Sequence, residues 1–250
     1  MWAWDAARVE TDAFLRQLTA DGTRLAGVAR AADWDAPVPG IDLTLREVLV
    51  HTGAVHRWSA DIVRRALTSN ERGSSAGFHP GLPDDEVPAW FDDGLAALTA
   101  TLAGAPDHLE AWAFGRLRPA AAFWSRRQAH ETAIHRTDVE SAAGVAVADF
   151  DADFAQDGLA ELVGGFAGQR GFATSTPGRL ALRASDGDDW LVVFGGERIV
   201  GAPSADTGDV DATVTGSSSD LYRWVWNRPS PAVVEGDDAV VALWREVRIG

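Results

Sequence analysis

The spacing of apolar residues changes once along the chain, near Gly171, and this change divides the fold into two parts of different class. Before it, apolar residues recur every three or four positions in four segments, which is the period of an amphipathic helix. These segments cover 5–32, 44–67, 90–104 and 120–144. After it, short apolar runs at 180–182, 190–194 and 210–214 alternate with turns rich in Asp and Gly, as in a sheet. We therefore expect an all-α four-helix bundle followed by a small α+β domain.

Local signals place the ends of several elements. Thr44 and Glu47 have the spacing of a capping box, and Ser217 to Asp220 resembles a second helix start. Further helices are expected over 157–166, leading out of the bundle, and over 238–244, with a last strand at 247–249. The bundle is expected to span residues 1–168 and the second domain 169–250. The polar segment 68–88 is long for a bundle loop, so we expect it to border a site.

Composition restricts the function more than it defines it. The net charge is −15 and the sequence pI about 4.7, which argues against nucleic acid or an anionic membrane as a partner. No apolar run approaches the length of a membrane span, and the start lacks the pattern of a signal peptide, so a cytoplasmic protein is expected. The chain has no Cys, so any thiol in its chemistry must come from a bound molecule. A small-molecule site fits best, and the sequence leaves monomer and dimer open.

One face of the fourth predicted helix carries ionisable groups. At about 100° per residue, His135 lies about 40° from Glu131 and Asp138 about 20° to its other side, on a face shared with Trp124. Burying such groups without partners is costly, whereas a divalent metal stabilises both a carboxylate and an imidazole. The i,i+4 spacing lets Glu131 and His135 reach one ion.

A third ligand is expected from the second helix, where two histidines are candidates. His51 lies in the buried stripe between Trp58 and Val55, whereas His56 points about 140° away, so the two are not expected to share one ion. Geometry alone leaves the choice between them open. A different interpretation also stands: His51 and His135 are hydrogen-bonded core histidines, and Glu131 pairs with an arginine, Arg127 or Arg46.

Two segments resemble a known family. Residues 45–58 (LREVLVHTGAVHRW) and 127–138 (RQAHETAIHRTD) are similar to the mycothiol-dependent maleylpyruvate isomerase family of the DinB-like superfamily. Leu221, Trp224 and Arg228 also resemble the small C-terminal domain of that family, and the order of elements matches over nearly the whole chain. The resemblance implies a DinB-like bundle with a metal at His51, Glu131 and His135. Zinc is expected from two imidazoles and a carboxylate, with other divalent metals open.

The resemblance also implies a cofactor and a reaction. The cofactor is the thiol mycothiol, and the reaction is a cis-to-trans isomerisation of maleylpyruvate by thiolate addition, rotation and elimination. A metal with an open coordination position suits this chemistry because it lowers the pKa of a thiol that binds it. Two other functions remain open: a mycothiol S-transferase acting on another electrophile, and a non-catalytic protein that binds a ligand or metal.

Three further residues are candidates for supporting roles. An anionic substrate needs local positive charge, which Arg228 or, on the second helix, Arg57 would supply by gripping a carboxylate. The alternative for each is a solvated surface arginine, and this alternative is favoured for Arg57. Asp138 is expected to orient His135, although it could instead cap the helix or pair nearby. His130 is expected to be structural.

Overall fold

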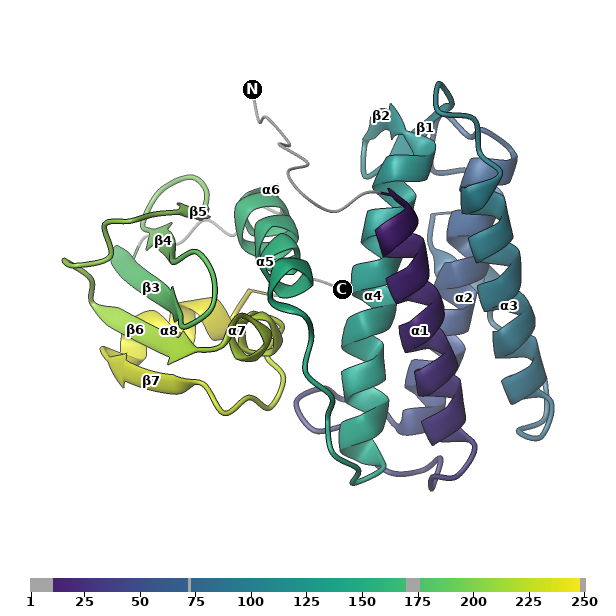
Figure 1. Cartoon of the computed structure of the whole chain (residues 1–250), viewed down its shortest axis with the longest axis horizontal. Coiled ribbons are helices and arrows are strands. Elements are labelled where there is room, and N and C mark those ends of the chain that lie inside the picture. The colour runs from purple at the N-terminus through teal and green to yellow at the C-terminus, as the bar shows by residue number, and fades with distance from the viewer. Residues whose placement is uncertain (1–10, 72, 170–175, 248–250) are drawn as a thin grey trace. The chain divides into compact units, whose positions relative to one another are not determined.

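The computed structural model describes residues 11–71, 73–169 and 176–247. They form two compact units that divide between Val147 and Ala148. The first unit is a bundle of four long helices, coloured purple to teal in Figure 1. They are α1 (Thr11–Ala29), α2 (Leu45–Arg64), α3 (Val87–Ala103) and α4 (Ala120–Ala142). The segment between α2 and α3 carries a 3-10 turn, η1 (Ser75–Phe78), that packs against α2. The predicted four-helix bundle is confirmed.

The helix starts follow from the sequence. Thr44 accepts a hydrogen bond from the Glu47 backbone N–H, and the Glu47 carboxylate accepts one from the Thr44 N–H, which makes the predicted capping box. Apolar stripes then bury Leu18, Val48 and Leu98 in the interior of the bundle. None of the helices in the described part of the chain is long and apolar enough to cross a membrane.

A hairpin that the sequence analysis did not predict precedes α4. Strands β1 (Glu110–Ala113) and β2 (Arg116–Pro119) pair antiparallel and join through Phe114 and Gly115, both at positive φ. This is the backbone of a two-residue hairpin turn, in which a Phe is unusual. Its ring lies 5.8 Å from that of Trp124 and 6.4 Å from that of Trp58, so aromatic packing holds the strained residue.

The second unit contains a five-stranded sheet of order β5-β4-β3-β6-β7. Its strands are β3 (Gly178–Ala184), β4 (Trp190–Phe194), β5 (Val200–Pro203), β6 (Ala212–Gly216) and β7 (Val233–Gly236). β3 pairs parallel with β6, and the other pairs are antiparallel. Three consecutive β3 residues, Leu180 to Leu182, are fully buried, so both faces of this central strand are covered. The expected α+β class is confirmed.

Helices complete the second unit. They are α5 (Ala152–Glu161), the π-helical turn η2 (Leu162–Phe166), α6 (Ala167–Gln169), α7 (Ser218–Val225) and α8 (Asp238–Arg245). Ser217 and Asp220 form the capping box expected at the start of α7. Val247 follows α8 without joining the sheet, and the rest of the strand expected at 247–249 lies outside the described residues.

The division between the units falls earlier than the expected 168/169. α5 packs on α7 in the second unit, where a Cβ on Gly158 would come within 2.3 Å of the Tyr222 ring. Phe150 and Phe154 also lie against Tyr222, at ring distances of 5.3 and 6.3 Å. The helical segment expected to lead out of the bundle is therefore part of the core of the sheet domain.

Candidate metal centre

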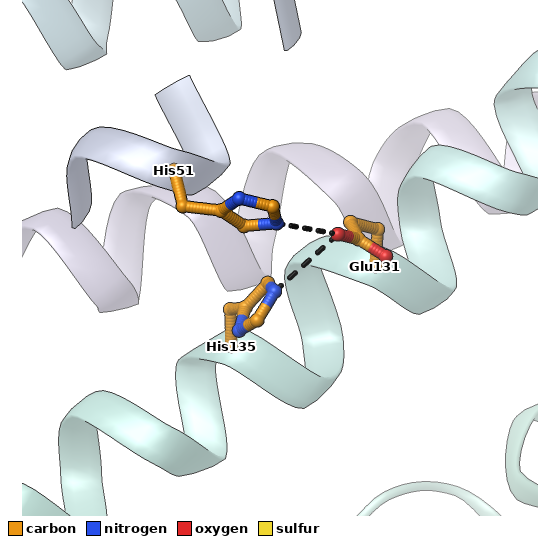
Figure 2. A group of neighbouring side chains, drawn as sticks. All are labelled: His51, Glu131 and His135. Carbon is orange, nitrogen blue, oxygen red and sulfur yellow. Dashed lines mark hydrogen bonds and ion pairs between the residues drawn. The ribbon is translucent and has the colours of Figure 1, made fainter. Parts of the chain in front are cut away.

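Two neighbouring helices of the bundle, α2 and α4, position the three predicted ligands. His51 projects from α2, and Glu131 and His135 project from α4 one turn apart (Figure 2). His135 is buried, Glu131 is 15% exposed and His51 is 38% exposed at the side chain. The group therefore lies at the edge of the bundle core, and His51 is the most exposed of the three side chains.

The two imidazoles converge on one carboxylate oxygen. His51 Nε2 and His135 Nε2 each lie 3.3 Å from Glu131 Oε1, and Figure 2 shows both interactions ending on that oxygen. The two rings are edge to face, with centroids 5.2 Å apart. One donor atom from each of the three side chains lies within 4.8 Å of the others, so the structure brings together the trio named from the sequence.

The donor set fits a divalent metal such as zinc. Bonds of about 2.0–2.2 Å at tetrahedral angles place neighbouring donor atoms roughly 3.3–3.6 Å apart. The two nitrogen-to-oxygen separations in the structure, both 3.3 Å, lie at the lower end of that range. Two imidazole nitrogens and one carboxylate oxygen are also a common combination at zinc sites that leave a coordination position open.

Asp138 controls which nitrogen of His135 faces the site. Its Oδ2 lies 2.9 Å from His135 Nδ1, and its side chain is 1% exposed. Because the carboxylate accepts a hydrogen bond from Nδ1–H, the proton of the neutral imidazole stays on Nδ1 and the Nε2 lone pair faces the site. Burial alone would lower the pKa of His135, but the hydrogen bonds and charges of Asp138 and Glu131 outweigh it and raise the pKa to about 9. The carboxylates of Asp138 and Glu131 therefore favour positive charge at this position.

Glu131 remains charged despite its position. Burial tends to raise the pKa of this carboxyl, but the Arg127 guanidinium and the hydrogen bonds from His135 and His51 hold it well below its usual range. Arg127 Nη2 is bonded to Oε2, the oxygen that the imidazoles do not contact. The ion pair with Arg127 that the sequence suggested as a different interpretation is thus present beside the histidine group. Arg46, the other arginine considered, pairs with Asp84 instead.

The remaining bundle histidines lie apart from this group. His56 is fully buried, with Nε2 2.8 Å from the Thr132 hydroxyl and its ring 5.4 Å from that of Phe91. His130 is fully buried and packs edge-on against Phe14 at 5.9 Å. The expected structural place of His130 agrees with this packing. Of the two histidines that the helical wheel left open, the structure places His51, and not His56, beside Glu131 and His135.

The two arginines considered as carboxylate clamps have different surroundings. Arg57 lies 4.0 Å above the Trp90 ring and donates hydrogen bonds to the carbonyl oxygens of Gly53 and Trp90. A Cβ on Gly94 would clash with its guanidinium, so Arg57 of α2 packs directly against the backbone of α3 at Gly94. Arg228 belongs to the second unit, is partly exposed, and donates from Nη1 to the Trp226 carbonyl at 2.8 Å.

The sequence analysis named Arg127 only as an ion-pair partner of Glu131 that would take the place of a metal. Arg127 is four residues before Glu131 on α4, and its side chain is 8% exposed. The i,i+4 spacing was visible in the sequence. The sequence does not show that Arg127 and the imidazoles contact different oxygens of the same carboxylate, because that depends on side-chain rotamers.

Two family models match the chain, one on each side of the division between its two units. The family model described as the mycothiol maleylpyruvate isomerase N-terminal domain matches residues 15–140, and the model for the C-terminal domain of the same enzyme matches residues 153–243. No protein with a curated description matches the chain.

Solved structures agree with this assignment at the level of the fold. A crystal structure of mycothiol-dependent maleylpyruvate isomerase is similar with a TM-score of 0.68 and 15% sequence identity. A mutant of that enzyme gives a TM-score of 0.67 at the same identity. Each comparison covers 92% of this chain and 95% of the other. Together, the two family matches show that the chain belongs to the mycothiol-dependent maleylpyruvate isomerase family.

Proposed function

We propose that the protein is a metal-dependent enzyme that uses mycothiol to isomerise a cis double bond of the maleylpyruvate type. The observation that carries the proposal is the convergence of His51 Nε2 and His135 Nε2 on Glu131 Oε1, in a chain that has no cysteine. Three ligands suit an ion that keeps a position for a further ligand. The family match supports an external thiol as that ligand.

His51, Glu131 and His135 would hold the metal, with zinc expected for this donor set. A bound divalent ion lowers the pKa of a thiol that joins it, which makes thiolate available near neutral pH. Within the chain, Asp138 keeps the His135 Nε2 lone pair directed at the site, and Arg127 holds Glu131 in place. His51 is the most exposed of the three proposed ligands.

Binding of an anionic substrate requires a positively charged side chain near the metal. Addition of the thiol to an activated double bond would convert it to a single bond, about which the substrate can rotate. Elimination of the thiol would then restore the double bond in the trans form. A substrate of the maleylpyruvate type carries carboxylates, and an arginine binds these through two parallel hydrogen bonds. Arg57 and Arg228 are the two arginines proposed for this role. The Arg57 guanidinium is bonded to two backbone carbonyls and covers Trp90. Arg228 donates to the Trp226 carbonyl.

The test is a turnover assay with purified zinc-loaded protein, mycothiol and maleylpyruvate. We expect loss of absorbance from the cis isomer that requires both metal and thiol, and its abolition in His135→Ala, with Asp12→Ala on an exposed part of α1 as a control. Turnover of a general electrophile in place of isomerisation would establish an S-transferase. Zinc binding by the wild type, lost in His135→Ala, without any thiol-dependent activity would indicate a binding protein.

A further inference from the structure

The two oxygens of Glu131 have different partners. Oε1 faces both imidazole nitrogens at 3.3 Å, and in Figure 2 both dashed lines end on it. Oε2 is bonded to Arg127 Nη2. A carboxylate can bind a metal through one oxygen or through both. Here one of the two oxygens is already held by a positive charge from the same helix.

Arg127 is well placed to keep this arrangement. It lies one turn before Glu131 on α4, and only 8% of its side chain is exposed. An ion pair shielded from water is much less easily exchanged for solvent than a surface pair, since breaking it leaves a buried charge without compensation. Charge-assisted hydrogen bonds from a guanidinium to a carboxylate are also among the stronger ones in proteins.

We propose that Arg127 is a positioning residue that restricts Glu131 to one-oxygen coordination and so preserves a metal position for an external ligand. Without it, Oε2 is free to turn toward the ion and take the position that the incoming thiol requires. This inference rests on the proposed metal and thiol function. It assigns to Arg127 a role in ligand access rather than in holding the metal itself.

The experiment replaces the spectroscopically silent zinc with Co²⁺. X-ray absorption of the cobalt protein reports how Glu131 binds, because the carboxyl carbon lies closer to the metal when both oxygens are ligands. Titration with 2-mercaptoethanol then measures thiol affinity through the thiolate-to-cobalt charge-transfer band. The variants are Arg127→Met, which removes the ion pair, Arg127→Lys, which restores a charge four residues from Glu131, and Arg127→Gln, which restores only a hydrogen-bond donor.

A matched control removes the same charge from the neighbouring position. Arg126 lies on α4 about 140° round the helix from Glu131, so Arg126→Met changes the net charge equally without removing the partner of Oε2. Circular dichroism of each variant establishes that it is folded.

We expect Arg127→Met to bind cobalt at least as tightly as the wild type, with both Glu131 oxygens coordinated and at least a tenfold loss of thiol affinity. Arg127→Lys and Arg126→Met should retain one-oxygen coordination and thiol affinity within about twofold of the wild type. One-oxygen coordination with unchanged thiol affinity in folded Arg127→Met overturns the inference, as does loss of cobalt from that variant. If Arg127→Met does not fold, Arg127→Gln, which also lacks the charge, takes its place and the same outcomes apply to it. Arg127→Lys, with wild-type coordination, is then the reference.

The wild-type protein separates this inference from the function on which it rests. Failure of the wild type to bind cobalt, or a wild-type cobalt site that never shows a thiolate band, contradicts the proposed function. In the second case the X-ray absorption comparison still decides whether Arg127 restricts Glu131 to one oxygen.

Discussion

Asp138 is buried and bonded to His135 Nδ1 at 2.9 Å, so it fixes both the tautomer and the direction of this ring. Partners of this kind typically change metal affinity by about 10–100-fold when they are removed. We therefore expect Asp138→Asn to weaken zinc binding by about that factor, as measured by competition with a chromophoric chelator. Asp12→Asn, at an exposed position on α1, is the control and should bind like the wild type. Equal zinc affinity in Asp138→Asn would show that His135 does not need this partner.

His56 makes a separate prediction about pH. Burial lowers the pKa of this imidazole to about 3, whereas in the unfolded chain it is near 6.5. The unfolded state therefore binds a proton that the folded state does not, and stability falls as pH drops below 6.5. By proton linkage, His56 alone should remove about 2 kcal/mol from the unfolding free energy of the metal-free protein between pH 7 and pH 5.

The measurement is urea unfolding of metal-free wild type and His56→Gln at both pH values. A glutamine amide can still bond the Thr132 hydroxyl that His56 Nε2 contacts at 2.8 Å, but it does not titrate. The variant should lose about 2 kcal/mol less than the wild type over this pH range. The same pH dependence in both proteins would contradict a neutral buried His56.

Residue types and spacing were sufficient to place Glu131 and His135 together, but not to choose the third candidate ligand. Helical periodicity places Glu131 and His135 on one face, because i and i+4 side chains are neighbours on any helix. The register between α2 and α4, which decides between His51 and His56, depends on how two helices pack, and the resemblance to a family supplied that choice. The separate contacts of the two Glu131 oxygens depend on rotamers and were outside the reach of sequence reasoning.

At the scale of elements, a buried ion-pair network joins α1 to α4. Arg136 is 2% exposed and bonds Asp21 of α1 at 2.9 Å and Glu140 at 2.6 Å, and Glu140 also pairs with Arg24. Removing one member of a buried network leaves the others uncompensated, at a cost of about 3–5 kcal/mol. We expect Arg136→Met to lower the free energy of unfolding by about this amount. Urea unfolding monitored by tryptophan fluorescence measures it. Arg16→Met on the exposed face of α1 should change it by less than about 0.5 kcal/mol.

Long elements were predicted better than short ones, for a physical reason. The four bundle helices each repeat the apolar period several times, and Thr44 and Glu47 mark one start chemically. The edge strands β5 and β7 have four residues each, and every residue of β7 is exposed, so no alternation of apolar and polar side chains identifies it. The turn of the β1–β2 hairpin also lacks the usual Asn-Gly signal, since Phe114 takes the first position with positive φ.

At the scale of the whole molecule, sequence patterns indicated two domains and their classes but placed the boundary about twenty residues too far along, relative to the structural division. An amphipathic pattern shows that α5 buries one face, but it does not show what covers that face. Packing against Tyr222 of α7 places α5 with the sheet. All three candidate ligands lie in the first unit under either boundary.

This placement predicts where metal binding stabilises the chain. A ligand that binds only the folded state raises the free energy of every opening that disrupts its site. Zinc should therefore slow amide hydrogen exchange in α2 and α4, which carry His51, Glu131 and His135, and leave β3, β4 and β6 unchanged. Hydrogen exchange followed by mass spectrometry of zinc-loaded and chelator-treated protein measures this directly. His135→Ala serves as the control, because zinc should then have no effect in either unit. Equal protection of the bundle and the sheet by zinc would show that the two units open together, and protection confined to the sheet would place the metal outside the bundle.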